Sequence, residues 1–284
     1  MYYTTPYEIY KDTWALCDPR FPVFLIKRKN RHILIEPEIS GCWELLLGHL
    51  NTVGIDLEEI DGCVVLHEHY DHLMLLPKLL EARGNIKIYG DRNLREILKK
   101  RDLLELYIQA DEFSSQKTYR SSHPPKTPQL EIEVEPLESL EKYNIETFNL
   151  PGHSPLSKGI LLGEGIFFVS DSLGFFGKEL GYCPLYFHNY NEYLASIERI
   201  KNLRNRFHTI ITGHNTIFMD KEVDEAIETA IEKTVELREK IDSLGLTEED
   251  KDYLLEEIYK GEFLLYPREI IANCARYLIK RSIS

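Results

Sequence analysis

The sequence lacks three features that would each have placed it in a large class of proteins. It has no run approaching the roughly 18 apolar residues of a membrane span, and its first residues show no basic region followed by an apolar stretch. Its 34 basic residues are outnumbered by 47 acidic ones, and a net charge of −13 disfavours a nucleic-acid-binding surface. Its five cysteines are scattered and odd in number, which is typical of reduced, mostly buried thiols. We therefore expect a soluble cytoplasmic protein that binds neither a membrane nor a nucleic acid.

Length and composition allow a sizeable core. The chain has 284 residues, of which 43% are hydrophobic, enough for one large two-layer domain with an appendage. Five segments before residue 110 have the pattern of regular structure: strands at 21–26, 32–36 and 85–90, and helices at 42–53 and 92–106. The first two strands would form a hairpin around Lys29 and Asn30. The polar stretch 111–130 predicts a surface loop that leaves His123 exposed.

One short segment concentrates side chains that bind metals. Residues 67–72 read His-Glu-His-Tyr-Asp-His, and the apolar run 63–66 before them predicts a buried strand that ends at this cluster. Alternation along an extended chain would place His67 and His69 on one side, and the turn that follows lets Asp71 and His72 reach a second metal. Imidazole nitrogens and a carboxylate oxygen suit Zn, Fe or Mn.

Three more residues of the same kind each follow a strand-like stretch or a glycine-bearing turn. His153 stands in Leu-Pro-Gly-His-Ser-Pro, Asp171 ends the apolar run 165–170, and His214 follows the run 209–213. A short loop at such a place holds a side chain at the edge of a sheet. The sequence therefore offers candidate ligands at four separate points.

Each candidate also has a purely structural interpretation. His153 and His214, taken singly, would more often be hydrogen-bonded loop histidines, and Asp71 could cap the helix expected from Leu73 onwards. Ser154, beside His153, is expected to cap a helix or to tighten its loop rather than to act as a nucleophile. The recurrence of ligand types in one order favours a metal site over independent structural roles.

That order, His-x-His-x-Asp-His, then Gly-His-Ser, then Asp, then Gly-His, resembles the metallo-β-lactamase-fold superfamily over residues 20–220. The resemblance implies an α/β fold, an αββα sandwich in which two β-sheets lie face to face with helices outside. Members often have an Asp-x-Gly loop after the second strand, where this chain has Glu-Pro-Glu at 36–38, so the supporting role of that loop is not carried over.

The resemblance also implies a ligand set and a cofactor. Carried over position by position, it places a first metal on His67, His69 and His153, a second on Asp71, His72 and His214, and Asp171 as the bridge between them. Asp71 and Asp171 are then the carboxylates that take part in catalysis. The implied cofactor is a pair of divalent ions, Zn or Fe, with Mn as a further option.

In layout, the chain is most similar to the thioesterase branches of that superfamily, the 2-aminobenzoylacetyl-CoA thioesterases of the quinolone-signal response type and the hydroxyacylglutathione hydrolases. This implies a metal-dependent hydrolase whose partner is a small-molecule acyl thioester or ester. A di-iron protein that responds to oxygen, and a metal-bearing regulatory protein with little hydrolase activity, remain alternatives.

The chain beyond residue 220 has a helical pattern. Apolar residues at helical spacing run from Val223 to Leu237 and predict a long helix that stops at Gly245. Thr247 and Pro267 have the chemistry of helix starts and predict two shorter helices, at 253–259 and 270–279. We divide the chain into a catalytic domain, 1–220, and a helical extension, 221–284, that covers or flanks the site. The extension is interpreted as a lid, a surface for a homodimer, or plain packing.

Aromatic residues that follow Asp171 have two interpretations. Six of them, counting one histidine, could form a rim around the site or belong to the core: Phe175, Phe176, Tyr186, Phe187, His188 and Tyr190.

Overall fold

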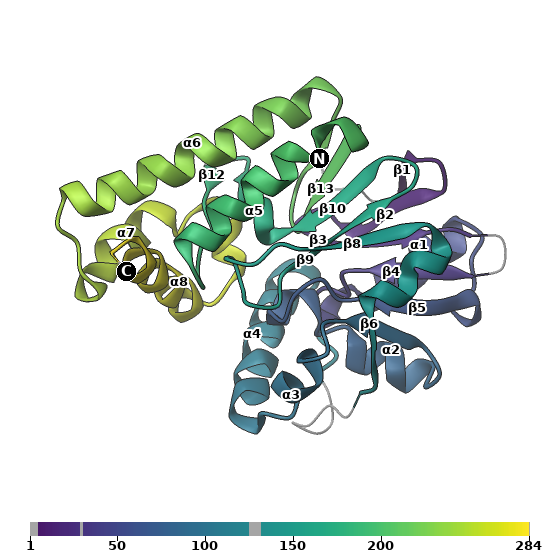
Figure 1. Ribbon diagram of the computed structural model, residues 1–284. Coiled ribbons are helices and arrows are strands. Elements are labelled where there is room, and N and C mark those ends of the chain that lie inside the picture. The colour runs from purple at the N-terminus through teal and green to yellow at the C-terminus, as the bar shows by residue number, and fades with distance from the viewer. Residues whose placement is uncertain (1–4, 29–30, 125–131, 284) are drawn as a thin grey trace. The chain divides into compact units, whose positions relative to one another are not determined.

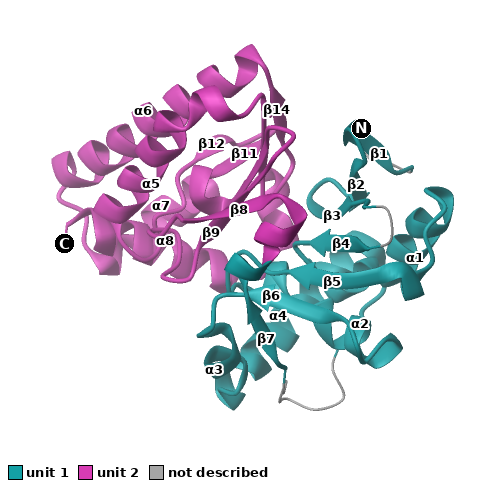
Figure 2. Ribbon diagram, turned by 45° about the vertical axis from the view of Figure 1, so that its right-hand side comes forward, with its two compact units in different colours: residues 1–139 teal, residues 140–284 magenta. Residues whose placement is uncertain are grey.

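The structure is a computed structural model, and it describes residues 5–28, 31–124 and 132–283 (Figure 1). The chain forms two compact units, Met1–Ser139 and Leu140–Ser284, which Figure 2 colours separately. The predicted boundary at residue 220 is a different division of the chain and stays a prediction.

The first unit contains one sheet whose strands follow their order in the sequence. Neighbouring strands from β1 to β4 run antiparallel, and those from β4 to β7 run parallel. Its strands are β1 (Tyr7–Tyr10), β2 (Thr13–Asp18), β3 (Phe21–Ile26), β4 (His32–Ile35), β5 (Ile60–Val64), β6 (Lys87–Gly90) and β7 (Val134–Pro136). Its helices are α1 (Trp43–Thr52), α2 (Leu76–Ala82), α3 (Leu94–Leu98) and α4 (Arg101–Tyr119).

The predicted hairpin is confirmed by the pairing of β3 with β4, although its turn at Lys29 and Asn30 lies outside the described residues. All residues of both strands are buried, which explains why they appear in the sequence as continuous apolar runs rather than as alternating patterns.

The second unit holds a sheet in the order β14-β13-β10-β9-β8 and a separate hairpin of β11 and β12. Its strands are β8 (Ile145–Asn149), β9 (Lys158–Leu162), β10 (Ile166–Ser170), β11 (Phe175–Gly177), β12 (Gly181–Cys183), β13 (Thr209–Thr212) and β14 (Ile217–Met219). Its helices are α5 (Tyr190–Asn202), α6 (Lys221–Ser243), α7 (Lys251–Ile258) and α8 (Arg268–Ser282). The α/β class with C-terminal helices is thus as predicted.

The C-terminal helices confirm the pattern in the sequence. Helix α6 buries Val223, Ala226, Ile227 and Ala230 along one stripe, and the chain leaves it through Gly245, whose φ is 63°. Thr247 forms a capping box just before α7, and Pro267 directly precedes the first residue of α8. Figure 1 shows α7 and α8 beside the long α6. No helix among the described residues is both long and apolar enough to cross a membrane.

The predicted loop at 111–130 is wrong in its first part. Helix α4 continues to Tyr119, and Asp111, Ser114 and Ser115 are buried on it. The polar residues are satisfied by partners distant in the sequence: Asp111 accepts hydrogen bonds from the backbone N–H of Ser40 at 2.7 Å and from its hydroxyl at 2.5 Å. His123, expected to be exposed, is half-buried and donates its backbone N–H to the Ser40 hydroxyl. Residues 125–131 lie outside the described part.

The buried Asp111 predicts an unusual pH dependence of stability. Burial raises its pKa from 3.8 to about 7, although the hydrogen bonds from Ser40 and Ser115 oppose the rise. Because the folded protein holds this proton more tightly than the unfolded chain, the stabilisation is fully present below pH 3.8 and is lost as pH rises towards 7. We expect Asp111→Asn to remove a negative slope of at most ~1.4 kcal/mol per pH unit from the free energy of unfolding.

Urea unfolding between pH 4 and pH 8 measures this difference. The control is Asp102→Asn at an exposed position of the same helix, which should follow the wild type at every pH. Parallel curves for the wild type and Asp111→Asn would contradict the prediction.

Candidate metal centre

In the first unit, the ligand cluster occupies the loop after β5. The strand ends at Val64, two residues earlier than the predicted run, and the 3-10 helix η3 (Tyr70–His72) follows the loop. His67 and His72 are 2% and 0% exposed, Asp71 is 7% exposed, and His69 is half-buried. The structure therefore buries three of these four candidates on one short loop, where an ionised or strongly polar group needs partners.

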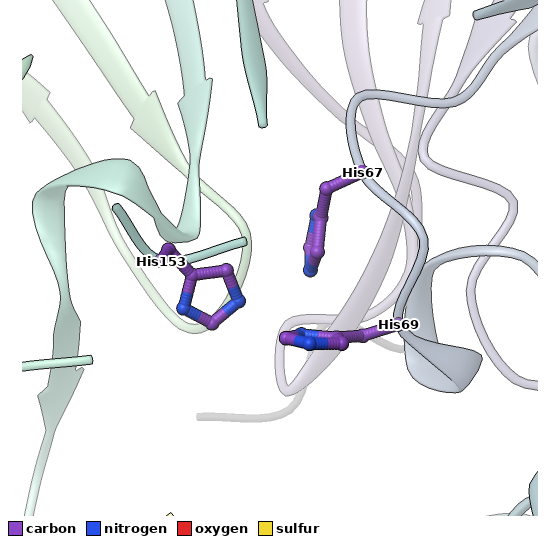
Figure 3. A group of neighbouring side chains, drawn as sticks. All are labelled: His67, His69 and His153. Atoms are coloured by element: carbon purple, nitrogen blue, oxygen red, sulfur yellow. The ribbon is translucent and has the colours of Figure 1, made fainter. Parts of the chain in front are cut away.

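The side chains of this loop converge. The ring centroid of His67 lies 4.9 Å from that of His69 and 4.1 Å from that of His72, and Nε2 of His72 lies 3.9 Å from a carboxylate oxygen of Asp71. Figure 3 shows the rings of His67 and His69 on this loop; it also draws His153, which belongs to the second unit. The predicted proximity of His67 and His69 is confirmed, although the chain bends at His67 instead of continuing as a strand.

Glu36 supports His72 by a hydrogen bond, a role that the sequence did not assign to it. Its carboxylate accepts a hydrogen bond from Nδ1 of His72 at 2.5 Å and another from the backbone N–H of Leu66 at 3.0 Å. A carboxylate oxygen of Glu38 lies 3.3 Å from the same Nδ1. A carboxylate at Nδ1 fixes the imidazole tautomer and leaves Nε2 as the nitrogen for a metal. Glu36 holds a φ of 57°, an uncommon value for a side chain of this size.

These acidic residues enlarge the donor set. Glu36, His67 and His72 each offer a ligand atom, and the three atoms lie within 4.8 Å of one another. Nitrogen and carboxylate oxygen donors without thiolate fit Zn, Fe or Mn. The buried carboxylates of Glu36 and Glu38 were visible in the sequence only as a Glu-Pro-Glu departure from the family pattern.

In the second unit, His153 lies in the loop between β8 and β9. Its Nδ1 lies 2.8 Å from the backbone carbonyl oxygen of Leu185. Because a carbonyl can only accept a hydrogen bond, Nδ1 is the donor and Nε2 is the basic nitrogen of the ring. Nothing in the residue pattern pointed to Leu185, since the contact joins backbone and side chain across 32 positions. Ser154 bonds to the Ser157 hydroxyl at 2.9 Å and tightens the loop, as expected.

Asp171 lies between His153 and His214. It follows β10 at Ser170, where φ is 48° and the pairing with β13 shifts register. One carboxylate oxygen of Asp171 is 3.4 Å from Nε2 of His153, and the other is 3.8 Å from Nε2 of His214. All three residues are buried. Each oxygen of the carboxylate thus faces a different histidine.

Two of the six aromatic candidates approach these histidines. The ring of Phe175 lies 5.8 Å from that of His214, and the ring of Phe187 lies 5.2 Å from that of His153. Tyr186, by contrast, belongs to the core and bonds to Ser282 of α8 at 2.9 Å. The C-terminal extension also reaches His214 directly, because the hydroxyl of Tyr266 lies 3.4 Å from its Nε2. The sequence singled out neither Tyr266 nor Ser282.

The cysteines take no part in the site. Burial raises the pKa of the Cys63 thiol well above its ordinary value, helped by the charge of Glu36, and burial raises the pKa of Cys183 to about 12. Both therefore stay protonated, and none of the cysteines forms a disulfide. The expectation of reduced, mostly buried thiols is confirmed.

Several solved structures are similar to this chain at low sequence identity. The metallo-β-lactamase MIM-1 from Novosphingobium pentaromativorans is 17% identical, with a TM-score of 0.55 over 81% of this chain and 88% of that one. An archaeal metallo-β-lactamase superfamily protein from Sulfolobus tokodaii is 16% identical, with a TM-score of 0.52 over 79% and 86%. Rubredoxin oxygen:oxidoreductase from Desulfovibrio gigas is 16% identical, with a TM-score of 0.55 over 81% and 61%. At these identities the likeness concerns the fold.

A comparison with protein-family models identifies the family as well as the fold. The model of the metallo-beta-lactamase superfamily matches residues 22–214, which is more than half of the chain. The matched segment contains all seven predicted ligand positions, from His67 to His214. The protein therefore belongs to the metallo-β-lactamase superfamily.

Proposed function

We propose that the protein is a dinuclear metal-dependent hydrolase that cleaves a small acyl thioester or ester. The observation that carries this proposal is the position of Asp171, with one carboxylate oxygen towards Nε2 of His153 and the other towards Nε2 of His214. A carboxylate placed in this way suits a ligand that bridges two metal ions. Members of the superfamily are generally hydrolases that bind divalent metals, which supports the reaction class.

The proposed centre uses the seven residues expected from the sequence. In this assignment, one ion is held by His67, His69 and His153 and the other by Asp71, His72 and His214, with Asp171 as the bridge. The donor set suits Zn or Fe, with Mn as a further option.

Hydrogen bonds within the chain orient two of the proposed histidine ligands. The Glu36 carboxylate accepts a hydrogen bond from Nδ1 of His72, and the Leu185 carbonyl accepts one from Nδ1 of His153, so each ring presents Nε2. A pair of divalent ions, when bound, supplies a nucleophilic water at neutral pH and polarises a carbonyl oxygen. Asp71 and Asp171 contribute the negative charge that holds such ions, and a protein nucleophile is unnecessary.

The substrate class is proposed from the resemblance to the superfamily's thioesterase branches and from the charge of the chain. A net charge of −13 gives little attraction for a polyanion, so we propose a small-molecule partner and no nucleic acid or membrane. We further propose that the protein works in the cytoplasm, and a homodimer through the helical extension is compatible with these roles.

One observation favours a second candidate. Rubredoxin oxygen:oxidoreductase is among the similar structures, and a site rich in histidine also binds iron well. A di-iron protein that responds to oxygen would show an iron-dependent absorption spectrum that changes on exposure to air. A hydrolase of the kind proposed would instead turn over its substrate when loaded with Zn²⁺, which has no redox chemistry.

The test of the proposed function is a hydrolysis panel. Purified protein, stripped of metal and then reloaded with Zn²⁺, Fe²⁺ or Mn²⁺, is assayed against an acyl-CoA, an acylglutathione, a lactone, a β-lactam and a phosphodiester. We expect turnover of a thioester or ester that depends on added metal. Activity on none of these compounds would refute the proposal, and a preference for the β-lactam or the phosphodiester would replace the substrate class.

A variant of Glu36 tests how the site is supported. We expect Glu36→Gln to weaken metal binding by about 10- to 100-fold, because the amide cannot hold the Nδ1 proton of His72 as a carboxylate does. Competition with a chromophoric chelator measures the affinity. The matched control is Glu44→Gln, at an exposed position of α1, which should bind metal like the wild type. Equal affinities for the wild type and Glu36→Gln would show that this carboxylate does not support the site.

A further inference from the structure

The C-terminal extension places a short segment, residues 259–266 between α7 and α8, against the β11–β12 hairpin. We call this segment the strap. It contains the 3-10 helix η8 (Gly261–Leu265), and the ring of Phe263 lies 4.5 Å from that of Phe175 on β11. The backbone N–H of Lys178 donates to the Glu262 carboxylate at 3.0 Å. The strap is therefore held to the hairpin by both an apolar and a polar contact.

The strap ends at Tyr266, which reaches a candidate metal ligand. Its hydroxyl lies 3.4 Å from Nε2 of His214, and the two rings are nearly perpendicular, with an interplanar angle of 88°. Tyr266 is 7% exposed. The hydroxyl of Tyr259 donates to the backbone carbonyl of Tyr266 at 3.2 Å and helps to hold its position. The contact is made on the Nε2 side, which is the side on which the proposed centre would hold its metal.

The surroundings make this hydroxyl effective as a hydrogen-bond donor. The rings of Phe175 and Phe263 lie 5.8 Å from His214 and 6.0 Å from Tyr266, respectively, so apolar groups flank the contact. In an apolar environment a hydrogen bond to an oxygen with negative charge is stronger than in water. A nitrogen that coordinates a metal cannot also exchange a hydrogen bond with a hydroxyl. With a metal on His214, the Tyr266 hydroxyl would therefore be left to donate to an oxygen of a substrate bound at the same metal.

We propose that Tyr266 is a substrate-binding residue whose phenol donates a hydrogen bond to a carbonyl or carboxylate oxygen held beside His214. This inference rests on the proposed metal centre and adds the residue by which the extension contacts the substrate. It assigns the strap a function beyond packing. The phenol acts as a neutral donor throughout, and it neither receives nor loses a proton.

The experiment uses the full-length protein loaded with Co²⁺, whose visible spectrum reports its ligands, and inorganic phosphate as the oxyanion probe. We expect Tyr266→Phe to bind phosphate about 10-fold more weakly than the wild type, a loss of ~1.4 kcal/mol, with the same Co²⁺ content and affinity. The phenylalanine keeps the ring contacts of the strap. The control is Tyr253→Phe, which removes a hydroxyl from a half-exposed position on α7 and should not change either affinity.

The possible results separate this inference from the proposed function. Equal phosphate affinities would overturn the role of Tyr266, and so would weaker Co²⁺ binding at an unchanged phosphate affinity, because that result assigns the tyrosine only to holding His214. A protein that binds no Co²⁺ would overturn the metal centre together with the inference. Weaker phosphate binding by Tyr266→Phe in a protein that hydrolyses no ester would support Tyr266 and refute only the hydrolase.

Discussion

Replacing Asp171 by asparagine is expected to lower kcat/KM of the metal-loaded protein by about 10³-fold or more, a loss of at least ~4 kcal/mol in transition-state stabilisation. The amide has a single oxygen acceptor, and its NH₂ group cannot coordinate a metal. It can therefore serve only one of the two sides on which His153 and His214 lie. The substitution also removes one negative charge from the proposed bridge.

Thermal unfolding gives a second measurement for Asp171→Asn. A metal that binds only the folded protein raises the melting temperature according to its affinity, and this increase should shrink in the variant. Without metal, the variant should be at least as stable as the wild type, because a buried amide costs less than a buried carboxylate. Asp242→Asn at an exposed position near the end of α6 is the control. Full activity of Asp171→Asn would exclude Asp171 as a ligand.

The second large effect is expected at Gly152, next to His153. Its φ is 118°, a conformation that residues with a side chain rarely adopt. A Cβ here would lie 2.1 Å from the backbone nitrogen and 2.3 Å from the Cα of Tyr193, which are main-chain atoms of α5 and cannot rotate away. Gly152→Ala should therefore destabilise the fold by about 4 kcal/mol or more, from backbone strain and overpacking together.

Urea unfolding of metal-free protein measures this loss, and two other glycines separate its causes. Gly245 has a φ of 63° with open space around its Cβ position, so Gly245→Ala should lose only the backbone contribution, ~1–2 kcal/mol. Gly48 lies in α1 with open space around its Cβ position, and Gly48→Ala should stabilise the helix by ~0.5–1 kcal/mol. If Gly152→Ala lost no more than Gly245→Ala, close packing against α5 would not be the cause.

Several strands and helices could be predicted because they depend on local patterns in the sequence. The apolar runs before His67 and Asp171 form β5 and β10, and the helical spacing after residue 220 forms α6. The two strands were predicted from continuous apolar runs and the helix from the spacing of its apolar side chains, and both signals are local. The loop predicted at 111–130 was wrong in its first part because an aspartate and two serines, which disfavour a helix in isolation, find buried hydrogen-bond partners distant in the sequence. Asp111 bonds to Ser40, Ser114 to Tyr70 and Ser115 to Gly41.

By itself, the sequence determined the seven candidate ligands and the apolar runs that precede His67, Asp171 and His214, since residue type and spacing are local properties. Only the tertiary structure decided which groups contact those ligands. Glu36 lies 36 positions from His72, Leu185 lies 32 from His153, and Tyr266 lies 52 from His214. Such contacts arise where the chain returns to the same place, and no local pattern encodes the partner of a hydrogen bond at that separation. The candidate ligands could therefore be named from the sequence, whereas the groups that contact their rings could be identified only in the folded chain.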